Sequence, residues 1–176
     1  MSELFYRVCV NKITKKRIVL NKLLDEEVEI FDNALLITES DNQGIITYAN
    51  RRFCNVSGYT KEELIGMHES ITRHPDMPEG LFKAMEKIVS QKKIWRGYVK
   101  ELSRDGRYYW VLMYVQAKLD ENDEIVGSIS TRKKAYTSSA QEAQEAYEKR
   151  RGEAFIDDPY FMRTELFLGD SIASRG

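Results

Sequence analysis

Short apolar runs separated by turn residues begin at residue 34. Residues 34–38 are mostly apolar, residues 41–44 read Asp-Asn-Gln-Gly, and residues 45–48 form a second apolar run. Asp and Asn favour turns, and Gly44 can adopt a positive φ without steric cost. Two such runs joined by a turn predict a β-hairpin.

The middle of the chain has the patterns of helices. Asn50 opens a short helix over residues 51–56, and Thr60 with Glu63 has the spacing of a capping box. Residues 78–91 then follow the rhythm of one buried helix face, and Pro78 suits a first helical turn. The apolar positions of this longer helix are Leu81, Phe82, Met85, Ile88 and Val89.

Three further strands are predicted at residues 95–102, 108–118 and 125–132, and the first two are joined by a turn that ends in Asp-Gly. Five strands with helices clustered in the middle predict an α+β fold, an antiparallel sheet covered by helices on one face. Such an arrangement leaves a hollow between helices and sheet, where a small ligand can bind.

The two ends differ from this central part. Residues 1–33 read as an N-terminal extension with one short strand at residues 5–10, because a basic stretch gives way to a cluster of acids after residue 24. Residues 34–136 form the predicted domain. Residues 137–176 read as a surface helix, with Ser139 and Glu142 as a capping box, followed by a tail rich in aromatic and acidic residues.

Composition narrows the range of functions. The chain has 176 residues and a formal net charge of −1, so nothing in its charge points to nucleic acid. It has no apolar run long enough for a membrane-spanning helix and no signal peptide, which predicts a cytoplasmic protein. Two distant cysteines and two histidines predict neither a disulfide nor a structural metal. No nucleophile motif or glycine-rich phosphate loop is present, so an enzyme is not expected.

Three stretches carry a resemblance to a known family. The segment ITESDNQGIITYANRRFCNVSGYTKEELIG, the motif RHPDMP, and the segment RDGRYYWV leading to GSISTRKKA together resemble a PAS domain between residues 35 and 133. The motif RHPDMP, at residues 73–78, is the more specific of the three. It is similar to the PAS domains of the Aer/CetB type, which serve aerotaxis and energy taxis.

The resemblance implies a sensor of redox or energy state that binds FAD and signals to a HAMP and methyl-accepting chemoreceptor-type partner. It also leaves open a homodimer. Arg73 is then expected to bind the diphosphate, while Phe82 and Trp95 supply apolar walls. The site residues implied in this chain are Asn50, Arg73, His74, Asp76, Phe82 and Trp95.

The residues also allow plainer roles. Phe82 and Trp95 can be core residues, Asn50 can be a helix cap, and Arg73 and Asp76 can form a structural ion pair. The chain departs from the flavin-binding pattern at two positions, with Glu86 in place of a Trp and Glu101 in place of an Asn. A carboxylate facing the pocket at either position would oppose an anionic cofactor.

Three alternatives stand beside flavin redox sensing. A photosensor of the LOV type needs a Cys directly after Asn50, and Arg51 stands there instead. Heme needs an axial ligand, for which His68 and His74 are the candidates. The third alternative is a PAS module without cofactor that acts in dimerisation or protein interaction.

Overall fold

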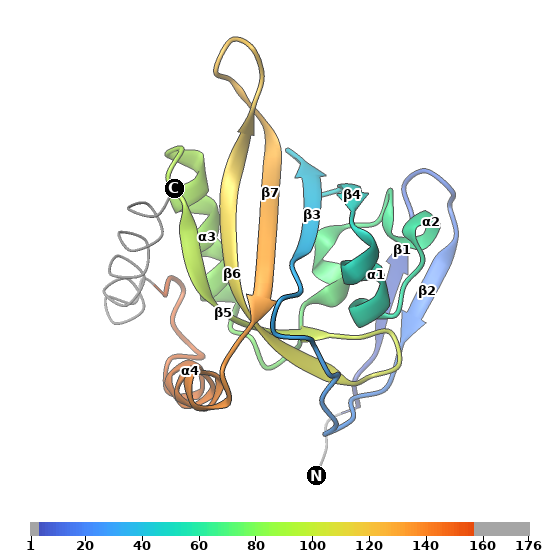
Figure 1. Cartoon of the computed structure of the whole chain (residues 1–176), viewed down its shortest axis with the longest axis vertical. Helices are drawn as coiled ribbons and strands as arrows, with labels where there is room; N and C mark the ends of the chain where they lie inside the picture. Colours follow the sequence, from blue (N-terminus) through green and yellow to red (C-terminus); the bar gives the residue numbers. More distant parts are fainter. Residues whose placement is uncertain (1–3, 157–176) are drawn as a thin grey trace.

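The computed structural model describes residues 4–156, and its centre is a five-stranded antiparallel sheet with the strand order β4-β3-β7-β6-β5 (Figure 1). The predicted hairpin is confirmed: β3 (Leu36–Asp41) pairs with β4 (Ile46–Ala49), and Gly44 in its turn has a φ of 79°. The remaining strands are β5 (Trp95–Leu102), β6 (Tyr108–Leu119) and β7 (Ile125–Lys134). The predicted α+β fold is therefore confirmed.

Four helical elements connect β4 to β5. They are α1 (Arg51–Ser57), α2 (Lys61–Leu64), the 3-10 helix η1 (Glu69–Thr72) and α3 (Glu79–Ser90). The predicted capping box of α2 is present, with Thr60 accepting from the Glu63 backbone and Glu63 accepting from the Thr60 backbone. The buried face of α3 agrees with the prediction at Leu81, Phe82 and Met85, while the last two predicted positions are partly buried. This helix packs against β5 and β6.

The N-terminal segment forms a second, two-stranded sheet from β1 (Arg7–Val10) and β2 (Arg17–Leu20). The prediction of one short strand missed β2. This segment also contacts the domain: Asn11 is 1% exposed and donates to the backbone oxygens of Glu63 and Ile65. Ile18 and Leu20 are part of the main core. Together with the hydrogen bonds of Asn11, they hold the hairpin against the domain beside α2.

After β7 the chain forms α4 (Thr137–Lys149). The predicted capping box at Ser139 is wrong, because the helix begins two residues earlier and its N-cap, Tyr136, makes no side-chain cap bond. The stripe Ala140, Ala143 and Tyr147 is buried, and the Tyr147 hydroxyl donates to the Tyr98 carbonyl at 2.6 Å. The helix is therefore held against β5. The predicted tail lies mostly outside the described residues.

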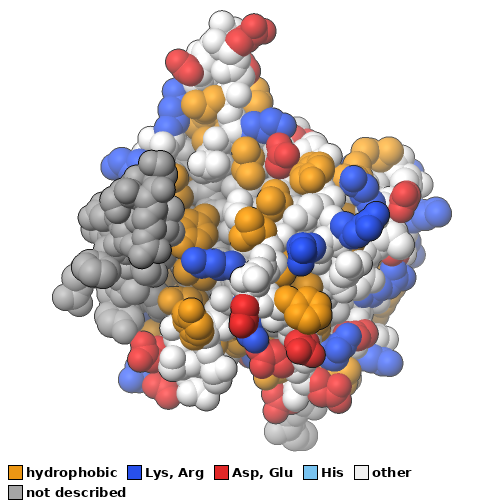
Figure 2. Space-filling view, in the orientation of Figure 1, with side chains coloured by type: hydrophobic (Ala, Val, Ile, Leu, Met, Phe, Trp, Pro, Cys, Tyr) orange, Lys and Arg blue, Asp and Glu red, His pale blue; other side chains and the backbone are white. Residues whose placement is uncertain are grey.

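Charged side chains of both signs are spread over the surface visible in Figure 2. Acidic groups gather at the projecting tip of the β6–β7 hairpin, where the sequence runs Asp-Glu-Asn-Asp-Glu. None of the helices in the described part of the chain has the length and apolar character needed to cross a bilayer.

Candidate ligand-binding cavity

A cavity of about 380 Å³ lies between the sheet and the elements η1 and α3. This volume is near the lower end of the range for small-molecule sites, which is roughly 300–1,000 Å³. One wall is apolar because the inward-facing positions of β5 and β6 meet the buried face of α3. Its side chains are Phe82, Met85, Val89, Val99, Met113 and Val115.

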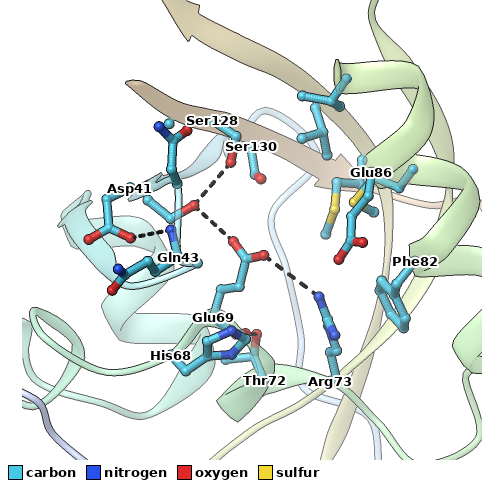
Figure 3. Close-up of a pocket in the computed structure, with 18 of the residues that line it drawn as sticks. Asp41, Gln43, His68, Glu69, Thr72, Arg73, Phe82, Glu86, Ser128 and Ser130 are labelled. Atoms are coloured by element: carbon cyan, nitrogen blue, oxygen red, sulfur yellow. Dashed lines mark hydrogen bonds and ion pairs between the residues drawn. The ribbon is translucent and has the colours of Figure 1, made fainter. Parts of the chain in front are cut away.

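The opposite wall is a row of interacting polar side chains (Figure 3). The Ser40 hydroxyl on β3 donates to Glu69 Oε2 at 2.9 Å and lies 3.0 Å from the Ser128 hydroxyl on β7. Glu69 Oε1 is 3.6 Å from Arg73 Nη2. This wall offers hydroxyl groups, one carboxylate and one guanidinium to a ligand, so it can both accept and donate hydrogen bonds.

Arg73 is the residue where the polar and apolar walls meet. It follows η1 directly, and its backbone oxygen accepts a 2.8 Å hydrogen bond from Arg7 of β1. Its guanidinium carbon lies 4.0 Å from the centre of the Phe82 ring, within the range of a cation–π contact. The structure therefore brings together two of the predicted site residues, Arg73 and Phe82, at the edge of the cavity.

Glu101 lies in the buried floor of the cavity and does not carry a free charge. It is 2% exposed and accepts from Arg132 Nε and, at 3.3 Å, from the Tyr109 hydroxyl. Arg132 also donates to Thr38 at 3.0 Å. Burial and the neighbouring Glu101 raise the pKa of Tyr109 well above its usual value, so this hydroxyl remains a donor. The charge of Glu101 is thus neutralised by Arg132 within the protein.

Glu86 is the other departure from the flavin-binding pattern. It lines the cavity from α3, one turn after Phe82, and is exposed. In Figure 3 its carboxylate is on the same side of the cavity as Arg73 and Phe82. Unlike Glu101, it therefore presents its charge at the cavity edge.

The next residues of the RHPDMP motif form a separate polar cluster that does not line the cavity. Asp76 accepts a 2.8 Å hydrogen bond from Lys100 of β5, and its backbone oxygen accepts one of 3.0 Å from Arg151. His74 is 6% exposed and its Nδ1 accepts from the Asp76 backbone at 3.0 Å. Burial and the charge of Lys100 lower the pKa of His74 to about 4. Burial alone would raise the pKa of Asp76, but Lys100 lowers it overall.

Asn50 and Trp95 also lie outside the cavity lining. Asn50 caps α1: its side-chain oxygen accepts from the backbones of Phe53 and Ile37, and its amide donates to Leu35. Trp95 is 5% exposed, and its ring covers Gly97 so closely that a Cβ there would lie 2.6 Å from it. The observed contacts of Asn50 are those of a helix cap, and those of Trp95 are those of a core residue. Ligand contacts for Asn50, His74, Asp76 and Trp95 stay predictions.

The two histidines are poorly placed to ligate heme. His68 lines the cavity, but its Nδ1 accepts from the Ser70 backbone at 3.1 Å. Its Nε2 faces the backbone of Gly44, where an added Cβ would be 2.7 Å away. His74 does not line the cavity, and its Nδ1 already accepts a hydrogen bond.

Sequence reasoning did not single out Glu69, Ser40 or Ser128. A signal was available for Ser40, because it continues the period-2 alternation of Leu36 and Thr38; the structure shows that these positions share the buried face of β3. Glu69 gives no comparable signal in the sequence, since its role depends on strands far from it in the chain.

Comparisons with known proteins define the class. Residues 46–132 match the family described as PAS fold. A PAS domain from Colwellia psychrerythraea superimposes with a TM-score of 0.55 at 25% identity, over 60% of this chain and 90% of that one. The light state of the blue-light photoreceptor Aureochrome1 LOV gives 0.56 at 18% identity, over 66% and 92%, which shows the fold alone. This chain contains a domain of the PAS family.

Within that family the chain is similar to an aerotaxis receptor. It is 36% identical over 110 residues to the aerotaxis receptor of Escherichia coli (strain K12), covering 62% of this chain and 22% of the receptor. It is 27% identical over 92 residues to a nitrogen fixation regulatory protein of Klebsiella pneumoniae, covering 52% and 19%. The chain thus spans about a fifth of the length of these relatives.

Proposed function

We propose that this chain is a flavin-dependent sensor of redox or energy state, and that the cavity holds the flavin ring. One observation carries the proposal: Arg73 contacts Phe82 at the place where the two walls of the cavity meet. One wall is apolar, and the other is formed by the hydrogen-bonded side chains of Ser128, Ser40 and Glu69. A planar heterocycle with polar edges needs both kinds of surface. FAD is the flavin that the resemblance to Aer-type domains predicts.

Different residues would bind different parts of the flavin ring. Phe82, Met85 and Val99 would pack against the ring, and Glu69 and Arg73 would bind its polar edge by accepting and donating hydrogen bonds. A bound flavin supplies a reversible change of redox state. The protein itself carries out no reaction in this proposal, so it acts as a sensor rather than an enzyme.

The signal would reach a chemoreceptor-type partner by way of the cluster around Asp76. This residue is three positions after Arg73 and contacts both β5 through Lys100 and the segment after α4 through Arg151. A ligand that moves Arg73 can therefore change the contacts of the C-terminal segment, which is our candidate for partner binding. We place this exchange in the cytoplasm.

Reconstitution tests the proposal. The protein is incubated with excess flavin, and the bound flavin is measured by absorbance after gel filtration. Arg73→Ala should lower flavin affinity about tenfold to hundredfold, because a charge-assisted hydrogen bond is worth about 1.5–3 kcal/mol. Arg17→Ala, which removes an exposed arginine on β2, is the matched control and should change nothing. A folded Arg73→Ala variant that binds flavin as tightly as the parent contradicts the role of Arg73.

If the parent protein binds no flavin, the proposed flavin sensor is replaced by the alternative, a PAS module for dimerisation or protein interaction. A sharp Soret band would instead indicate heme.

A further inference from the structure

The charged groups that line the cavity are unbalanced. Its lining has four acids and two bases, a formal net charge of −2, namely Asp41, Glu69, Glu86 and Glu101 with Arg73 and Arg132. Most flavin cofactors carry phosphate, and repulsion between like charges opposes binding. The arrangement of these groups therefore bears on which flavin the cavity accepts.

Two of the acids are held by contacts within the protein, and one of these two is paired with a cation. Glu101 pairs with Arg132 in the buried floor, so neither has charge left for a ligand. Asp41 accepts hydrogen bonds from the backbones of Gln43 at 2.9 Å and Ile45 at 3.0 Å, and these fix it in the turn. The groups that remain for a ligand are Glu69, Glu86 and Arg73.

Arg73 is the arginine available to a phosphate, and it already has a partner. Glu69 Oε1 is 3.6 Å from its guanidinium, and the ring of Phe82 packs against the guanidinium at 4.0 Å. Glu86 adds a second carboxylate at the same edge of the cavity (Figure 3). A phosphate at Arg73 would therefore be attracted by one cation and repelled by two carboxylates.

A neutral ring does not meet this repulsion. Glu69 can accept a hydrogen bond from a ring N–H, while Arg73 and Ser40 can donate to ring carbonyl oxygens. We infer that the cavity selects a neutral flavin, with riboflavin as the simplest example, over flavins that carry phosphate groups. This inference rests on the proposed function, because it concerns which flavin the same cavity binds.

The size of the effect follows from Coulomb's law. A carboxylate and a doubly charged phosphate about 8 Å apart in water repel each other enough to lower affinity about fivefold. Glu86 is exposed, so salt should weaken its part of the effect.

The experiment compares three flavins and two matched variants. Riboflavin, FMN and FAD are titrated into the parent protein, Glu86→Gln and Glu145→Gln, with quenching of flavin fluorescence as the readout. Glu145 is an exposed glutamate on α4 that does not line the cavity, so its variant removes the same charge elsewhere.

The parent protein should bind riboflavin more tightly than FMN or FAD. Glu86→Gln should tighten FMN and FAD binding about threefold to tenfold and change riboflavin binding less than twofold, and Glu145→Gln should change none of the three. Glu69→Gln, which keeps an acceptor for Ser40, should likewise tighten the binding of FMN and FAD relative to riboflavin. The inference is overturned if FAD binds as tightly as riboflavin and Glu86→Gln leaves their ratio unchanged. If none of the three flavins binds, the proposed function fails as well.

Discussion

Replacing Arg132 with methionine should destabilise the domain strongly, because it leaves a buried carboxylate without its partner. Arg132 is 5% exposed and Glu101 is 2% exposed, so Glu101 would be left mostly out of solvent when its ion pair is lost. Removing one partner of a buried ion pair typically costs about 3–5 kcal/mol. Domains of this size are stable by about 5–15 kcal/mol, so the variant should be close to the limit of folding.

Urea unfolding followed by circular dichroism measures this change directly. The midpoint should fall while the slope of the transition stays the same, since the surface exposed on unfolding is unchanged. Lys118→Met is the matched control. It breaks a pair with Glu39 of 2.9 Å, but Lys118 is 47% exposed, so the cost should be at most about 1 kcal/mol.

A double variant separates charge from packing. Arg132→Met combined with Glu101→Leu removes both charges, and replacing a buried pair with apolar residues of similar volume is often neutral or stabilising. The double variant should therefore recover most of the lost stability. The reasoning is refuted if Arg132→Met costs less than about 1 kcal/mol, or if the double variant is no more stable than the single one.

Three further predictions concern residues that do not line the cavity. Trp95→Ala should lower the free energy of unfolding by about 3–5 kcal/mol in urea titrations, as for a core aromatic; an unchanged unfolding midpoint would contradict this. The pKa of His74 is lowered from 6.5 to about 4, so unfolding binds a proton between these values. Stability should therefore fall by up to about 3 kcal/mol as pH falls from 6.5 to 4, and His74→Asn should lose this dependence in urea titrations; an unchanged slope counts against it. Gly80→Ala should displace the segment after α4, because its Cβ would lie 2.4 Å from the Glu153 carbonyl, and trypsin should then cleave faster after Arg151. An unchanged cleavage rate would show that the segment tolerates the methyl group.

The main elements could be predicted because their signals are local. The sequence predicts a helix over residues 78–91 and α3 covers Glu79–Ser90, since one apolar face and a first-turn proline define such a helix by themselves. Strand β2 was missed because it has four residues and follows directly after lysines, so only Ile18 and Leu20 show its alternation. The start of α4 was misplaced because this helix begins without a capping side chain.

The candidate site was less accessible from sequence because it depends on contacts between distant segments. Glu69 binds a serine 29 positions earlier on β3, and that serine contacts another one 88 positions later on β7. The neutralisation of Glu101 likewise needs Arg132, 31 positions away. Arg73 and Phe82 were found through the family resemblance, but their contact with each other follows only from the way η1 leads into α3.

The absorbance spectrum of the protein after incubation with excess flavin tests the central claim most directly. The account predicts a yellow protein that keeps its flavin through gel filtration, absorbs in the blue, and is bleached reversibly on chemical reduction and reoxidation. A folded protein that stays colourless with riboflavin, FMN and FAD would contradict it.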